Sequence, residues 1–64
     1  MVKINGTFSD VTGSVFSECL TDMGYDLKRI AVECNGEIVP KAQYGQRVIE
    51  EDDVIEVVSF VGGG

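Results

Sequence analysis

Apolar and polar positions alternate over residues 1–4, the pattern of a strand with one buried face. Asn5-Gly6 follows, and an Asn-Gly pair between strand-like runs favours a type I′ hairpin turn, because both central residues of that turn need a positive φ. We therefore expect the first strand to fold back on a second strand over about 7–11. Either Phe8 or Val11 should then face the core.

One amphipathic helix is predicted next, over about residues 14–23. Ser14 suits the N-cap, because its hydroxyl can accept from the first unpaired amides of the helix. Glu18 places negative charge near the positive end of the helix dipole, and Gly24 supplies a left-handed stop. Apolar side chains recur at helical spacing, and the predicted apolar face consists of Val15, Phe16, Cys19, Leu20 and Met23.

The second half of the chain reads as short strands separated by turns. Residues 30–34 alternate, which puts Cys34 on the core side. The expected order is a strand over 30–34, a turn at Asn35-Gly36, an extension over 37–39, a turn-like segment over 40–45 that Pro40 opens, a brief strand over 47–49, an acidic turn over 50–53 and a last strand over 54–61.

This order predicts an α+β fold. Two hairpins with one helix between them are most simply accommodated by a mixed sheet of four to five strands packed on that helix. The arrangement is the β-grasp, or ubiquitin-like, fold, in which the first and last strands lie side by side and parallel at the centre. We expect one such domain over residues 1–61, followed by a flexible glycine tail over 62–64.

Both faces of the last strand carry apolar side chains. A period of two separates Ile55 and Val57 from Val58 and Phe60, whereas a half-solvated strand should be polar on its outer side. One interpretation is a central strand with an imperfect pattern. The other is an exposed apolar patch that binds a partner, with Val58, Phe60 and Val61 as the partner interface at the root of the tail.

Composition excludes several kinds of function. The net charge of −6 disfavours nucleic acid as a partner and favours a protein with a basic docking surface. The chain has no histidine, which removes the usual nucleophile pairs and general base, so we expect no catalytic residues. There is no apolar run long enough to span a membrane, and no signal segment is recognisable. A cytoplasmic protein fits these features.

The two cysteines and the acidic run are the remaining candidates for chemistry. Cys19 and Cys34 invite a redox or sulfur-relay interpretation, but both fall on the predicted core face, where cysteine behaves as a small inert hydrophobe. Without histidine they make a poor zinc site. The run Glu50 to Asp53 lacks the spacing of a calcium loop. We therefore expect no bound metal or cofactor.

The chain closes on Gly62-Gly63-Gly64. Such an end can be a frayed terminus. Alternatively, the glycine end can bring its carboxylate to a site inside a partner protein. Without Cβ atoms, it can enter a channel too narrow for other residues, and four residues beyond Phe60 can extend about 13 Å. Ordering each glycine costs about 1–2 kcal/mol, which hydrogen bonds in a partner groove must offset. The terminal carboxylate is a poor electrophile, so it reacts only after activation, usually by joining to AMP.

These residues resemble the ThiS family of sulfur-carrier proteins of thiamine biosynthesis. The resemblance covers nearly the whole chain. It rests on 2–6, on the helix after Ser14-Val15, on 29–33, on the Asn-Gly-Glu-Ile-Val-Pro run over 35–40, on 53–58 and on 60–64. The chain departs from the family at Glu51-Asp52-Asp53, where Asp-Gly-Asp is usual, and at Cys34, where a larger aliphatic residue is common.

The resemblance implies a carrier rather than an enzyme. A ThiF-like adenylyltransferase would use ATP to adenylate Gly64, sulfur would replace the AMP to give a thiocarboxylate, and a ThiG-like thiazole synthase would receive the sulfur. Gly63 and Gly64 would form the reacting end, with Gly62 and the apolar root as docking elements. Two alternatives stay open. One is a carrier of the same chemistry for another product, such as molybdopterin or an amino acid, or a ubiquitin-like modifier conjugated to lysine. The other is a binding module with an inert tail.

Overall fold

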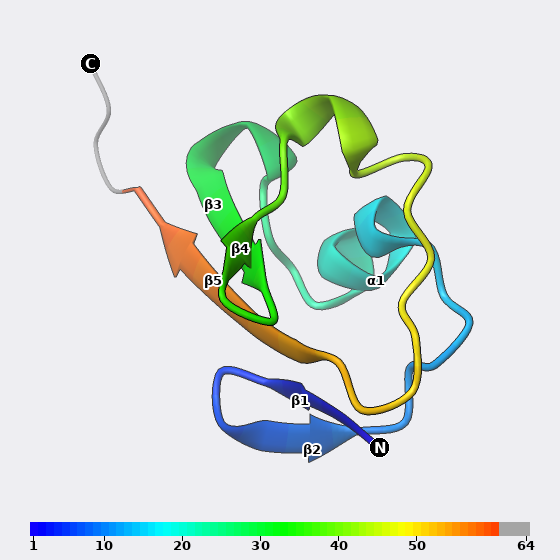
Figure 1. The fold of residues 1–64 in the computed structure, drawn as a ribbon. Helices are drawn as coiled ribbons and strands as arrows, with labels where there is room; N and C mark the ends of the chain where they lie inside the picture. The colour runs from blue at the N-terminus through cyan, green and yellow to red at the C-terminus, as the bar shows by residue number, and fades with distance from the viewer. Residues whose placement is uncertain (61–64) are drawn as a thin grey trace.

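The computed structural model describes residues 1–60, and a five-stranded mixed sheet packs one of its faces against an α-helix (Figure 1). The strands are β1 (Val2–Ile4), β2 (Thr7–Ser9), β3 (Ile30–Cys34), β4 (Glu37–Ile38) and β5 (Val54–Ser59). The helical elements are α1 (Phe16–Asp22) and the short 3-10 helices η1 (Leu27–Arg29) and η2 (Lys41–Gln43). Within residues 1–60, no helix has the length and apolar character needed to cross a membrane.

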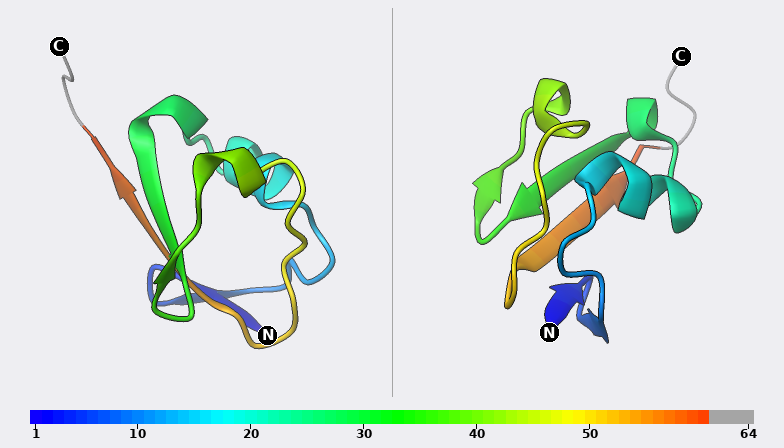
Figure 2. Two further views of the ribbon diagram at one scale, coloured as in Figure 1. Left: turned by 45° about the horizontal axis from the view of Figure 1, so that its top comes forward. Right: turned by 90° about the vertical axis from the view of Figure 1, so that its right-hand side faces the viewer.

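The strand order is β2-β1-β5-β3-β4, which places β5 at the centre of the sheet (Figure 2). β5 runs parallel to β1 and antiparallel to β3. This is the arrangement expected for a β-grasp fold, and the prediction of first and last strands lying side by side and parallel is confirmed. Because β5 is central, the chain leaves the sheet after Ser59 from its middle strand and not from an edge strand.

Both Asn-Gly pairs form the predicted tight turns. Asn5 and Gly6 have φ of 48° and 83°, and Asn35 and Gly36 have φ of 54° and 84°. These left-handed values are the ones that a type I′ hairpin turn requires. The first turn connects β1 to β2, and the second connects β3 to β4.

The core lies between α1 and the inner face of the sheet. Its largest fully buried side chains come from the helix, from three strands and from the loops between β4 and β5, namely Phe16, Leu20, Ile30, Ile49, Ile55, Val2, Val32, Val39 and Cys34. Ile4, Cys19, Tyr44 and Val57 complete this core. The predicted core positions in β3 and those of Phe16, Cys19 and Leu20 in the helix are confirmed. The prediction was wrong for Met23, which is 49% exposed, and for Val15, which is only half-buried and lies outside the core cluster.

The second strand is shorter than predicted, because it ends at Ser9. Of the two residues proposed to face the core, Val11 packs against it. Phe8 does not: it is 65% exposed on the side of the sheet away from the helix, where the Lys3 Nζ atom lies 5.4 Å from the centre of the Phe8 ring. Phe8 pairs with Lys3 in the hairpin register, so the two side chains share a face opposite to Val2 and Ile4.

The prediction that Ser14 caps the helix is wrong. α1 begins at Phe16, and no side chain caps it. Backbone carbonyls of the loop after η2 do this instead: the Phe16 amide donates to the Arg47 carbonyl (2.9 Å), and the Ser17 amide donates to the Tyr44 carbonyl (2.8 Å). Ser14 contributes a backbone hydrogen bond instead, because its carbonyl accepts from the Ile49 amide (2.8 Å). The end of the helix is as predicted, with Gly24 at φ 93°.

Residues 47–49 do not form the expected brief strand. They make one isolated antiparallel bridge, between Val48 and Val15, and their backbone groups bond to residues 13–16 rather than to the sheet. Ile49 is nevertheless fully buried. The apolar pattern therefore predicted the burial of Ile49 correctly. The backbone of residues 47–49, however, forms hydrogen bonds with the start of the helix instead of joining the sheet.

The outer sheet face at the end of β5

The end of β5 presents apolar side chains to solvent. Val58 is 59% exposed and Phe60 is 52% exposed, whereas Ile55 and Val57 on the opposite face are buried. The outer side of β5 is thus uncovered within residues 1–60, and its role as a partner interface stays a prediction. The last described backbone contact is the Phe60 amide donating to the Arg29 carbonyl (2.7 Å). Val61, Gly62, Gly63 and Gly64 lie outside the described residues.

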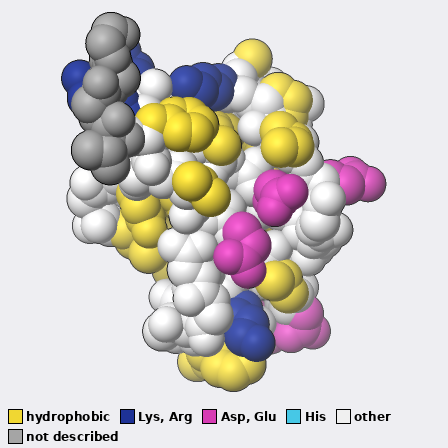
Figure 3. Space-filling model, turned by 90° about the vertical axis from the view of Figure 1, so that its left-hand side faces the viewer, with side chains coloured by type: hydrophobic (Ala, Val, Ile, Leu, Met, Phe, Trp, Pro, Cys, Tyr) yellow, Lys and Arg dark blue, Asp and Glu magenta, His cyan; other side chains and the backbone are white. Residues whose placement is uncertain are grey.

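The strand register places specific neighbours around Val58. Ala31 on β3 lies directly opposite it, and the next outward-facing pair along the same two strands is Glu33 opposite Glu56. Ile38 on β4 in turn pairs with Glu33 and is 68% exposed. We call this set, Ala31, Glu33, Ile38, Glu56, Val58 and Phe60, the outer face. Figure 3 shows acidic side chains among hydrophobic ones on this side of the molecule.

Basic side chains gather at the end of the molecule where β5 ends. Lys28 and Arg29 belong to η1, and the Lys41 Nζ atom of η2 donates to the Lys28 carbonyl (3.0 Å). The Arg29 Nε atom lies 3.6 Å from an Asp26 carboxylate oxygen. Three of the five basic residues of an otherwise acidic chain therefore lie near the root of the tail, which the composition alone did not indicate.

Two asparagine side chains fix the position of β5. The Val57 amide donates to Asn5 Oδ1 (2.7 Å), and Asn5 Nδ2 donates to the Val57 carbonyl (3.3 Å). The Val54 amide donates to Asn35 Oδ1 (2.9 Å). The turn conformation of both asparagines is predictable from the sequence, but this second role depends on the approach of β5 and is not.

A buried carboxylate also holds the start of β5. Asp53 was expected in a solvated turn, but it is buried, while the other three acids of that run are exposed. Its carboxylate accepts from the Asn35 side chain (2.9 Å) and from the Glu50 amide (2.9 Å). Burial by itself raises the pKa of Asp53, but these hydrogen bonds outweigh it and hold the pKa below its usual value.

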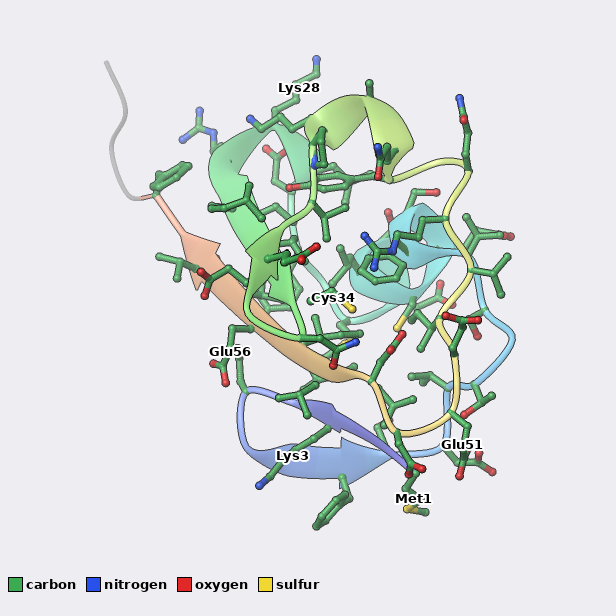
Figure 4. The ribbon with its side chains drawn as sticks, in the orientation of Figure 1. Met1, Lys3, Lys28, Cys34, Glu51 and Glu56 are labelled. Atoms are coloured by element: carbon green, nitrogen blue, oxygen red, sulfur yellow. The ribbon has the colours of Figure 1, made fainter. Side chains whose placement is uncertain are left out.

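Both cysteines lie in the core, as predicted. Burial raises the pKa of the Cys19 thiol, and the nearby charge of Asp22 adds to the effect. Burial and then the Asp53 charge raise the pKa of the Cys34 thiol, which lies on the side of the sheet that faces α1 (Figure 4). Thiols held protonated and shielded are weak nucleophiles. Within residues 1–60, no group of three or more histidine, cysteine or acidic side chains could hold a metal ion.

Comparison with known protein families places the chain in one of them. The model of the ThiS family matches residues 2–64. The chain belongs to the ThiS family. The family match covers β5 and the terminal glycines as well as the core, so the resemblance seen in the sequence is confirmed over nearly the full length.

Individual relatives agree with this assignment. The chain is 36% identical over 64 residues to the sulfur carrier protein ThiS of Thermus thermophilus, with all of both chains covered. It is 42% identical over 62 residues to a thiazole synthase of Paramagnetospirillum magneticum, where the match spans 95% of this chain and 19% of the synthase. A second thiazole synthase, of Magnetococcus marinus, is covered over 16% of its length.

A solved structure supports the fold independently. The crystal structure of a thiamine biosynthesis protein, ThiS, of Geobacter metallireducens superposes with a TM-score of 0.75 at 27% identity. The superposition covers 98% of this chain and 97% of that one. The β-grasp architecture of residues 1–60 is thus the fold of a ThiS protein.

Proposed function

We propose that this chain is a sulfur carrier of thiamine biosynthesis rather than an enzyme. The observation that carries the proposal is the match over the complete length of a ThiS protein named as a sulfur carrier. The uncovered apolar side chains of Val58 and Phe60 at the end of β5 support it, because a carrier must dock on the enzymes that load and unload it.

The reacting group in this proposal is the carboxylate of Gly64. A ThiF-like adenylyltransferase joins it to AMP from ATP and releases pyrophosphate. A sulfur nucleophile at the oxidation level of sulfide then attacks the glycyl carbonyl, AMP leaves, and the tail ends as a thiocarboxylate. Residues 1–61 present the tail, residues 62–64 enter the partner, and the carrier itself binds no cofactor. We place the reaction in the cytoplasm.

The sulfur acceptor is a ThiG-like thiazole synthase. Two relatives called thiazole synthase contain a stretch similar to nearly all of this chain or to most of it. A carrier segment within the synthase polypeptide raises the effective concentration of the tail at the synthase. Such a pairing supports thiazole formation as the destination of the sulfur.

Intact-mass measurement tests the proposal. The chain is incubated with ATP, a sulfide source and the ThiF-like enzyme of the same genome, and a species heavier by the difference between sulfur and oxygen is expected. A chain extended by one alanine after Gly64 is the control, because it keeps the fold but lacks the glycyl carboxylate. A mass that never changes, or an extended chain that is loaded equally well, would contradict the proposal.

A further inference from the structure

Two carboxylates face each other on the outer face. Glu33 on β3 and Glu56 on β5 are direct partners in the antiparallel register, and both are exposed. Like charges at directly opposed positions destabilise an antiparallel pair. Within residues 1–60, neither carboxylate takes part in an ion pair. From the register alone, we expect the opposed charges to lower the stability of the free fold.

The surroundings of this pair are apolar and continuous with the docking surface. Ile38 lies beside Glu33 on the strand at the edge of the sheet, and the Ala31–Val58 pair is the next outward pair toward the tail. The Glu56 side chain lies on the side of the sheet away from α1 (Figure 4). A partner that covers Ile38 and Val58 would also cover the two carboxylates and exclude water from them.

We propose that Glu33 and Glu56 together bind an arginine of the adenylating enzyme when the carrier docks on it. This inference rests on the proposed function. A guanidinium group suits the site because its planar fork donates to two carboxylates at once, while its weak hydration suits an apolar surround. The cation also removes the repulsion between the two strands. The net charge of −6 steers the same encounter.

The described arginines of a second copy of this chain are poorer occupants. Arg29 is engaged with Asp26, and the Arg47 guanidinium lies 5.5 Å from the centre of the Phe16 ring. The thiazole synthase is also the weaker choice, because relatives that contain a carrier-like segment within the synthase bring the two together without steering charge. The adenylating enzyme is the occupant that needs a charged encounter site.

The test compares Glu33→Gln, Glu56→Gln and the double variant in pyrophosphate release by the ThiF-like enzyme of the same genome. Glu37→Gln is the matched control, because Glu37 is an exposed acid on β4 whose register partner Cys34 places it on the opposite face. For the double variant, we expect the KM for the carrier to rise about tenfold with kcat nearly unchanged, as for loss of binding shared by the ground and transition states. The control should match the wild-type chain.

The Tm of the free chain is an independent measurement, because the same substitutions that weaken binding should make the free chain more stable. Each single glutamine variant should raise the Tm of the free chain at low salt, since it removes the like-charge contact. Glu56→Lys should raise the Tm further, by attracting Glu33, and should raise the KM more than Glu56→Gln does. An unchanged Tm in the glutamine variants, or a Glu56→Lys chain that docks like the wild type, overturns the proposal.

The remaining outcomes separate this inference from the proposed function. A wild-type chain that is never adenylated contradicts the proposed function and this inference together. A wild-type chain that is adenylated, with glutamine variants of unchanged KM, overturns only the arginine site. Variants that weaken binding to the thiazole synthase alone, or that abolish self-association alone, overturn the assignment of the occupant.

Discussion

The side-chain amide of Asn5 pairs with both backbone polar groups of Val57. Asn5 Oδ1 accepts from the Val57 amide at 2.7 Å, and Asn5 Nδ2 donates to the Val57 carbonyl at 3.3 Å and to the Tyr25 hydroxyl at 3.2 Å. Asn5 thus continues the ladder between β1 and β5 beyond the point where the β1 backbone turns away. The first hairpin turn thereby holds the strand that leads to the tail.

Asn5→Gly should separate this contact from the turn conformation. Glycine adopts the φ of 48° seen at Asn5 without strain, so the turn should persist while the side-chain hydrogen bonds are lost. We expect the free energy of unfolding to fall by about 1–3 kcal/mol, as measured by urea denaturation. A variant as stable as the wild type would show that the Asn5 side chain does not hold β5.

Asp53 predicts how stability depends on pH. Hydrogen bonds in the folded state hold its pKa below the usual value, so its contribution is present above the unfolded pKa of about 3.9. That contribution is lost as the pH falls through the still lower folded pKa. Asp53→Asn should therefore lower stability at neutral pH by about 1–3 kcal/mol and flatten the acid limb of the profile.

Asp52→Asn is the control for the Asp53 prediction. Asp52 is its neighbour in the same turn, and its side chain is 83% exposed. It sits at φ 66°, which asparagine tolerates. Its substitution should leave the acid limb nearly unchanged. Equal slopes for Asp53→Asn and the wild type in urea titrations at several pH values would argue against the buried hydrogen bonds as the cause.

Features that depend on a few neighbouring residues were predictable from the sequence. The Asn-Gly turns, the Gly24 stop and the alternation over 30–34 depend on φ preference and burial, and the structure has all of them. The exposed Val58 also followed from the pattern, since so short a chain has little material to cover a second sheet face.

Predictions failed where a distant backbone decides the outcome. Ser14 is a sound N-cap by type, but the carbonyls of Tyr44 and Arg47 already receive the first helix amides. Asp53 reads as one of four turn acids, and only the approach of Asn35, on another hairpin, makes it a buried acceptor. The Glu33–Glu56 pair likewise depends on a strand register that no single segment contains.

The cysteines should take no part in sulfur transfer. Burial raises the pKa of both thiols, and neither side chain is exposed. Cys19→Ala and Cys34→Ala should each lower stability by on the order of 1 kcal/mol, because each leaves a small cavity. The sulfur-loaded species in intact-mass spectra should form at the wild-type rate. Loss of loading in a folded variant would instead support a relay through that cysteine.

Val58 and Val57 allow the docking function of β5 to be separated from its packing. The two residues are adjacent, but Val57 is 8% exposed in the core and Val58 is 59% exposed on the outer face. Val58→Ser should change the free energy of unfolding by less than about 0.5 kcal/mol, yet weaken binding to the adenylating enzyme by about tenfold, as for a central interface residue. Val57→Ser should instead destabilise the fold by about 2–4 kcal/mol. Parallel urea denaturation and binding titrations distinguish the two effects, and a Val58→Ser chain that binds at wild-type affinity would remove Val58 from the interface.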